Sequence, residues 1–327
     1  MDDAVLSPTG RQDAAPAAAL APEGGAPSPA GQQPGTPVPA SSRQPGAATS
    51  RPNLRATGIA LLLAAAFLLG FAGFLYGLSG LQESRSQAVM FTRLRFELAG
   101  GLAPLGWTTP GRGVTADGTP IAILDIPRIG VHNMVVVQGT SSETLTLGPG
   151  HLRDSPFPGQ PGVSEIFGRQ ATFGGPFARL GQLRRGDTIR VATGEGWSTY
   201  VVAALAPSTK TIRDPAPNRL LLLTATPAVA PAYYLTVDAR LTSAVHGSPG
   251  VAPVISSTEL PLAGDHSGLA LTAAMEWALA LALVSAGAVF AALRWSRWAA
   301  YLASAPLILA VLWNLYQSLA ALLPNLY

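Results

Sequence analysis

Cysteine, which supplies the thiolate nucleophile of many enzymes, is absent from the 327 residues of this chain. Thiolate catalysis, disulfides, iron–sulfur clusters and cysteine-bound zinc are therefore excluded. Hydroxyl groups remain, and Thr224 and Thr226 flank Ala225 at the end of an apolar run. A threonine nucleophile needs an adjacent base, and His151 is the candidate for that role. The plainer interpretation is that the threonines finish a strand and the histidine makes a local hydrogen bond.

Metal ions, cofactors and nucleic acids are not indicated by the remaining polar residues. His246 and the pair Asp265-His266 stand some twenty residues apart, a poor pattern for a metal site. The formal net charge is only +3, without the dense basic run that a nucleic-acid surface needs. We therefore expect no metal, no cofactor and no nucleic-acid partner.

The composition indicates lipid contact and a polar tail. Only 12% of the residues are charged and 48% are hydrophobic, whereas soluble domains carry about 25% charged residues. Residues 1–55 consist mainly of Pro, Gly, Ala, Ser and Gln. Such a segment buries too little apolar surface to offset its ordering entropy. We predict a disordered tail there.

Three long apolar runs predict three transmembrane helices, at residues 57–79, 270–293 and 299–323. The link between the last two is short, so they form a hairpin across the bilayer. Arginines precede the first run, and Arg294 and Arg297 lie in the link. The positive-inside rule therefore predicts a multi-pass plasma-membrane protein with a cytoplasmic N-terminus and residues 80–268 outside the cell.

The outer segment is typical of β-structure. Short β-branched or apolar runs separated by Gly, Pro and Asp predict strands, and their spacing fits an all-β barrel or sandwich; the runs are 121–126, 134–137, 187–191, 199–204, 219–224 and 233–241. Within the juxtamembrane segment 80–118, an amphipathic helix over about 82–112 is expected. Residues 243–268 are predicted to be a linker. On the last strand, Tyr234 and Asp238 share a polar face that is a candidate groove wall.

Six runs in the outer segment follow one another in a recognisable order: Ile121 to Val131, Val137 to Thr140, Leu145 to His151, Pro158 to Gly162, Gly174 to Leu180 and Leu183 to Ile189. Together they resemble the sortase family. The resemblance implies an extracellular sortase-like β-barrel at residues 119–242, in a fold that is mainly β with three transmembrane α-helices. Sortases are membrane-anchored cysteine transpeptidases of Gram-positive bacteria, which join secreted proteins to the cell wall or to pilins.

The same resemblance identifies three positions where the family keeps its catalytic side chains. Arg169 stands where the family has histidine, Ala225 where it has the nucleophilic cysteine, and Tyr234 is the best match to its arginine. A methyl group cannot attack a carbonyl, and a guanidinium does not act as a base near neutral pH. Three replacements together indicate a catalytically degenerate member, a pseudo-sortase.

We therefore expect a module that binds a secreted or surface protein or peptide, such as a pilin or an active sortase, during surface-protein attachment or envelope assembly. Its candidate binding residues are His151, Arg169, Thr224, Thr226, Tyr234 and Asp238. Two alternatives stay open. One is an active transpeptidase or hydrolase with a threonine nucleophile, and the other is a membrane scaffold that works through its helices.

Overall fold

A computed structural model describes residues 54–109, 113–209, 216–228, 231–247, 250, 257–294 and 297–327. The chain divides into two units, Met1–Asn53 and Leu54–Tyr327. The predicted disordered tail therefore lies outside the described residues, except for its last two, which begin the first helix. Parts of the predicted 243–268 linker also lie outside them.

The first helical stretch combines three elements, α1 (Leu54–Gly73), a π-helical turn (Phe74–Leu78) and α2 (Ser79–Ala99). Its apolar part is long enough to cross a membrane. The helix ends at Ala99 with Gly100 as its C-cap, because Gly101 takes a positive φ of 65° that glycine adopts readily. The expected amphipathic helix over 82–112 is therefore shorter than predicted.

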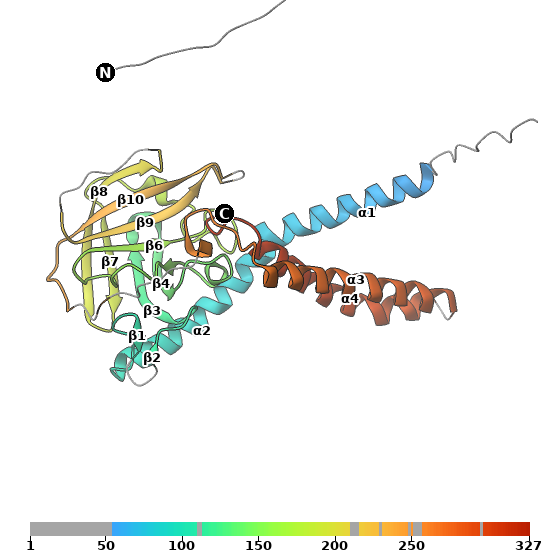
Figure 1. Cartoon of the computed structure of the whole chain (residues 1–327), viewed down its shortest axis with the longest axis horizontal. Helices are drawn as coiled ribbons and strands as arrows, with labels where there is room; N and C mark the ends of the chain where they lie inside the picture. Colours follow the sequence, from blue (N-terminus) through green and yellow to red (C-terminus); the bar gives the residue numbers. More distant parts are fainter. Residues whose placement is uncertain are drawn as a thin grey trace, which may run out of the picture. The chain divides into compact units, whose positions relative to one another are not determined.

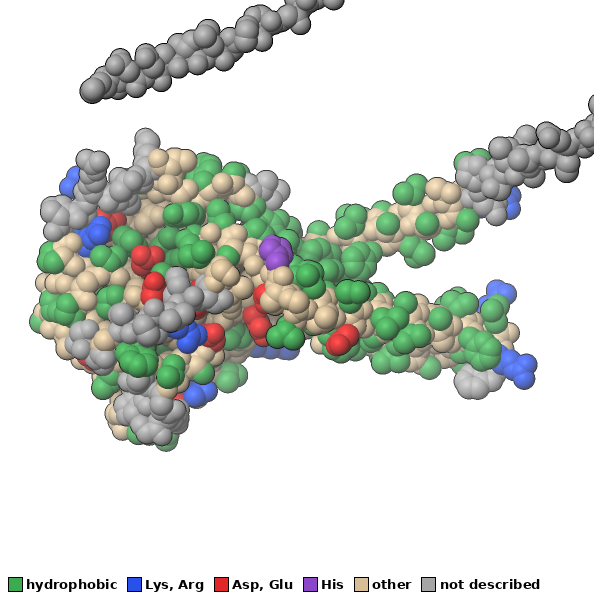
Figure 2. Space-filling model, viewed as in Figure 1, with side chains coloured by type: hydrophobic (Ala, Val, Ile, Leu, Met, Phe, Trp, Pro, Cys, Tyr) green, Lys and Arg blue, Asp and Glu red, His purple; other side chains and the backbone are tan. Residues whose placement is uncertain are grey.

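Two further helices, α3 (Gly268–Arg294) and α4 (Arg297–Ala321), lie side by side (Figure 1) and are also apolar and long enough to cross a membrane. Hydrophobic side chains cover much of this α3–α4 hairpin in the space-filling view, with basic side chains at its far end (Figure 2). Arg294 and Arg297 lie at that end. Exposed leucines such as Leu293, at 82% exposure, suit a lipid environment.

The segment between α2 and α3 contains a closed eight-stranded β-barrel, which decides between the barrel and sandwich expected from sequence. Its strands are ordered β10-β8-β7-β3-β4-β5-β6-β9. The pairs β4–β5 and β6–β9 are parallel and the others antiparallel. The barrel strands are β3 (Pro120–Ile126), β4 (Val131–Gln138), β5 (Gly150–His151), β6 (Val163–Phe167), β7 (Thr188–Thr193), β8 (Gly196–Pro207), β9 (Arg219–Thr226) and β10 (Tyr233–Leu241); β1 (Thr108–Thr109) and β2 (Gly113–Val114) form a separate pair.

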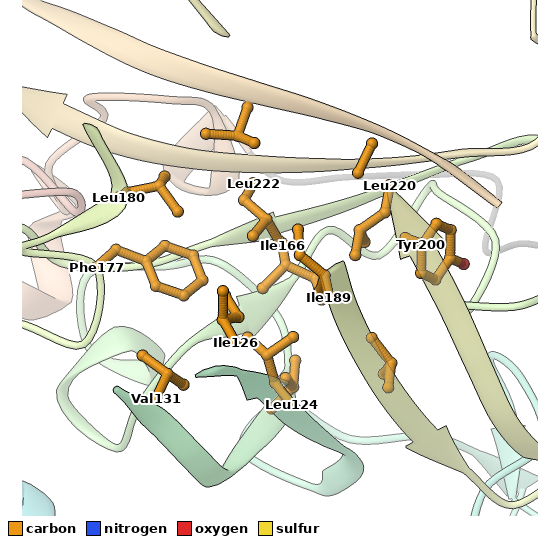
Figure 3. Close-up of a cluster of buried hydrophobic side chains, with 14 of the residues drawn as sticks. Leu124, Ile126, Val131, Ile166, Phe177, Leu180, Ile189, Tyr200, Leu220 and Leu222 are labelled. Carbon is orange, nitrogen blue, oxygen red and sulfur yellow. The ribbon is translucent and has the colours of Figure 1, made fainter. Parts of the chain in front are cut away.

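Apolar side chains from every long strand fill the barrel (Figure 3), among them Leu124, Ile166, Ile189 and Leu222. On the predicted last strand, Val237 and Ala239 are buried in this core. Because successive side chains of a strand point to opposite faces, the barrel core accounts for these two residues and not for the residues between them.

Strand β3 is buried on both faces because α2 covers the outside of the barrel. Met90 and Leu94 of α2 belong to a second apolar cluster, together with Ile123 of β3 and Val135 of β4. The Gln87 side chain accepts the Val135 N–H at 2.8 Å and donates to the Val135 carbonyl at 3.1 Å. Helix α2 is therefore fixed to β4 by hydrogen bonds as well as by apolar packing.

Candidate functional site

The strand register brings Arg169, Ala225 and Tyr234 to one edge of the barrel. Ala225 of β9 pairs directly with Tyr234 of β10. Strand β6 runs parallel to β9 and its last residue, Phe167, aligns with Leu223. Arg169 follows Phe167 by two residues, in the loop after β6, and the intervening Gly168 donates its N–H to the Leu223 carbonyl at 2.9 Å, so this loop begins beside the end of β9.

The environment of Ala225 is apolar and closed. Its side chain is fully buried in a third apolar cluster with Leu145, Leu152, Phe167, Leu223 and Leu326. A methyl group in such a cluster offers no lone pair to a substrate carbonyl. Tyr234, which is partly exposed, packs against the same cluster.

Arg169 is fully buried, and oxygen atoms accept hydrogen bonds from its guanidinium. Its Nη2 donates to the Ser142 carbonyl at 2.7 Å and to the Ser142 hydroxyl at 2.9 Å. Its Nη1 donates to the Thr172 hydroxyl at 3.1 Å and to the main-chain oxygen of Tyr327 at 3.4 Å. The guanidinium also lies 4.8 Å from the centre of the Phe173 ring, within the range of a cation–π contact.

Burial lowers the pKa of Arg169 to about 9, because desolvation disfavours the charged form. The side chain is still protonated at neutral pH. Among the described residues, no aspartate or glutamate side chain forms an ion pair with it. The site therefore carries a buried positive charge that attracts oxygen acceptors.

The Thr224 hydroxyl serves as a structural tie. It donates to the Gly168 carbonyl at 2.8 Å and is 1% exposed, so it links β9 to the loop after β6. Thr226 is partly exposed at the end of β9. Among the described residues, neither threonine hydroxyl bonds a histidine or a carboxylate, so no base is placed to activate either one.

His151 of β5 lies in a separate buried centre. Its Nδ1 is 3.1 Å from the Gln138 Oε1, and its Nε2 is 3.0 Å from both the Pro156 carbonyl and the Ser155 hydroxyl. Burial lowers the pKa of His151 to about 4, so the imidazole is neutral at neutral pH.

The tautomer of His151 follows from its partners. Because the Pro156 carbonyl only accepts, Nε2 carries the proton and cannot take one from Ser155. The Gln138 amide nitrogen has no partner as placed. Exchanging the amide O and N lets this nitrogen donate to Nδ1. The Ser155–His151 contact, which the sequence did not reveal, is therefore not a nucleophile–base pair.

Asp238 lies away from this edge. It is fully buried, and its Oδ2 is 3.4 Å from Nη1 of Arg219. Four residues of β10 separate it from Tyr234, or about 13 Å along a strand. The structure therefore does not bring these two residues of the expected polar face into one site.

The segment after α4, Leu323–Tyr327, was missed as part of the site. Gln170 donates its N–H to the Leu326 carbonyl at 2.9 Å, and Thr172 donates its hydroxyl to the Tyr327 carbonyl at 2.5 Å. Leu326 is fully buried. The sequence did contain a signal for this segment. Leu326 and Tyr327 follow Pro324, which ends a helix, and such large side chains need a surface to pack against.

An open cavity of about 800 Å³ is lined both by barrel loops, at Ser141 and Phe173, and by α4, at Ser318 and Ala321. Within the described ranges, no group of three histidine or carboxylate side chains could hold a metal ion.

Comparisons with known proteins agree on one family. Residues 124–242 match the model of the Sortase domain. Sortase D of Bacillus subtilis is 34% identical over 85 residues, which cover 26% of this chain and 41% of that protein; the match thus spans less than half of that relative. Sortase E of Streptomyces avermitilis is 32% identical, covering 39% of this chain and 91% of that one, with a TM-score of 0.34. A sortase D5 transpeptidase of Clostridium perfringens is 24% identical, covering 39% and 82%, with a TM-score of 0.35. Residues 124–242 match the Sortase domain, and the match at 32% identity extends over 91% of the sortase E chain. The chain therefore belongs to the sortase family.

Proposed function

We propose that the barrel is a non-catalytic sortase domain, which binds an extended segment of a surface protein and does not cleave it. The observation that carries this proposal is Ala225, a buried methyl group at the position where the family resemblance puts the nucleophile. Without a nucleophile there is no acyl-enzyme, whatever the rest of the site supplies.

The neighbouring residues support binding in place of catalysis. Arg169 stays protonated and is held by Ser142 and Thr172, so it does not serve as a general base. Tyr234 brings one hydroxyl and no positive charge to an oxyanion. What the edge does offer is a buried cation, a backbone N–H at Gln170 and an apolar cluster, which are the groups that hold an extended peptide.

In this proposal the three apolar helices span the plasma membrane, with the N-terminus and the Arg294–Arg297 link in the cytoplasm and the barrel outside. A surface protein, such as a pilin or a protein handled by an active sortase, would meet the barrel there. The threonine-nucleophile alternative is disfavoured, because the Thr224 hydroxyl already donates to the Gly168 carbonyl.

A scaffold role is the second candidate, and one observation favours it. Trp313 and Tyr316 of α4 pack against Phe74 of the first helical stretch, with ring centres 5.0 and 5.8 Å apart. The hairpin thus has a specific partner within the chain. A partner protein that co-purifies only when α3 and α4 are present would support this role.

Catalysis is tested on the full chain in lipid nanodiscs, with a labelled sorting-signal peptide, a triglycine acceptor and an active sortase as positive control. We expect no cleaved or transferred product by mass spectrometry, from the chain itself or from its Thr224→Val and Thr226→Val variants. Product that forms with the native chain and disappears in either threonine variant would overturn the proposal.

A further inference from the structure

We infer that the segment Leu323–Tyr327 is an intramolecular ligand of the barrel, which a peptide from another protein must displace. Its receptor, called the Arg169 site below, consists of Ser142, Arg169, Gln170, Thr172 and the cluster around Ala225. The inference rests on the proposed function, because it names the ligand class and the regulation of that same binding edge.

Backbone hydrogen bonds hold the segment as they would hold an added peptide. The Gln170 N–H binds the Leu326 carbonyl at 2.9 Å, and the Asn325 N–H binds the Ala263 carbonyl at 2.8 Å. The Asn325 side-chain amide donates to the carbonyls of Thr140 at 2.7 Å and Leu260 at 3.0 Å. Main-chain bonds of this kind do not depend on sequence, whereas the Asn325 contacts select an amide side chain.

Leu326 supplies the apolar anchor. Its side chain is fully buried in the cluster that contains Ala225, Phe167 and Leu223. Because the residue at position 225 is small, room remains in this cluster for a branched aliphatic side chain from the segment. The Arg169 site therefore favours a leucine-sized residue directly after the amide.

The buried charge acts on the next residue. Arg169 and Thr172 both donate to the main-chain oxygen of Tyr327, and a hydrogen bond from a charged donor is stronger than one between neutral groups. The ligand class that follows is an extended peptide with an amide side chain, then a branched aliphatic side chain, then a residue whose main-chain oxygen faces the guanidinium.

The segment can leave without opening the barrel. Eight strands close the barrel and none of them comes from residues 323–327. No residue of the segment belongs to the barrel core. The cavity of about 800 Å³ lined by Ser141 and Ala321 provides open space next to the contacts of Ser142 with the end of α4. Occupancy of the Arg169 site is therefore separable from folding.

The probe that tests this is a fluorescent pentapeptide of residues 323–327, Leu-Pro-Asn-Leu-Tyr, prepared with a C-terminal amide and with a free C-terminal carboxylate, both of which keep an oxygen acceptor at Tyr327. We expect anisotropy to show saturable binding to a nanodisc-embedded chain that ends at Leu322. The full chain should bind the peptide at least tenfold more weakly, because its own segment competes. A peptide with Leu326→Ala should bind about 10- to 100-fold more weakly, from the lost burial of the aliphatic side chain.

Two barrel variants of the shortened chain serve as a matched pair. Ala225→Leu fills the space that the Leu326 side chain occupies and should abolish peptide binding. Ala178→Leu, at an exposed alanine, should leave peptide binding unchanged. Equal peptide binding by the full and shortened chains, or none by a shortened chain that keeps its melting transition, would overturn the inference. Neither result involves a cleavage product, so the failure of this inference is distinguishable from that of the proposed function.

Discussion

His151 and Arg169 are both fully buried nitrogen bases on neighbouring parts of the barrel, yet they are held in different ways. The partners of His151 are Gln138, Ser155 and Pro156, all within eighteen residues of one another in sequence. The partners of Arg169 include Ser142, Thr172 and Tyr327, which come from three separate parts of the chain. The His151 centre is thus complete within the barrel, whereas the Arg169 site depends on a segment beyond α4.

The two buried side chains also differ in their charge at neutral pH. Burial lowers the pKa of His151 to about 4 and that of Arg169 to about 9, so only Arg169 is charged at neutral pH. A neutral, saturated centre contributes to stability. A charged centre that has one of its partners, Tyr327, in the segment beyond α4 has the properties expected of a binding site.

Removing the segment should give the largest change. In a chain that ends at Leu322, the Gln170 amide loses the Leu326 carbonyl, and its hydrogen exchange should accelerate on the order of 1,000-fold from the lost burial and hydrogen bonds. The Gly139 amide, which binds the His151 carbonyl at 2.9 Å, is the control and should not change. Equal acceleration at both amides would mean that the two regions are not independent.

Acid should destabilise the His151 centre. The folded pKa of about 4 lies below the ordinary 6.5, so the unfolded chain takes up the proton first. The stability contribution is complete above about pH 6.5 and is lost as the pH falls towards 4, by about 3 kcal/mol in total. Thermal unfolding of the full chain and of His151→Gln between pH 4 and 7 measures this. Parallel profiles for the two proteins would contradict the assignment.

Replacing the buried charge should loosen the segment with a smaller effect. Arg169→Met keeps most of the volume but removes the charged donor to the Tyr327 carbonyl, and exchange at the Gln170 amide should rise about tenfold. Arg190→Met is the matched control, because Arg190 is half exposed and pairs with Asp125 on the barrel surface. Slow Gln170 exchange in Arg169→Met would show that the charge does not retain the segment.

The smallest effect is expected at Ser155. Its hydroxyl accepts the Glu165 N–H at 3.1 Å and donates to the Leu152 carbonyl at 2.8 Å, so Ser155→Ala should cost about 1 kcal/mol. Peptide binding by the shortened chain should stay the same. A change in binding with unchanged stability would instead connect the His151 centre to the Arg169 site.

The features that could be predicted were those determined by residues close together in the sequence. The apolar runs at 121–126 and 219–224 lie within β3 and β9, and the family resemblance identified Arg169, Ala225 and Tyr234, which the strand register brings to one edge. Leu326 was missed because its contacts join residues more than a hundred positions apart. The burial of Asp238 was missed for a similar reason, since its Arg219 partner lies on the neighbouring strand.

We expect the segment and an external peptide to compete for the Arg169 site. The chain has no cysteine, so Thr172→Cys with Tyr327→Cys can be joined in the full chain by a short bifunctional maleimide. Trp197→Cys with Tyr327→Cys is the control pair, because Trp197 lies on β8 three residues beyond Tyr200, the partner of Leu241, and thus about 33 Å of strand away from Tyr234. We predict a crosslink in the first pair only, with a yield that falls in excess unlabelled pentapeptide and not in a scrambled one. A yield that peptide leaves unchanged, or equal yields in both pairs, would contradict the account.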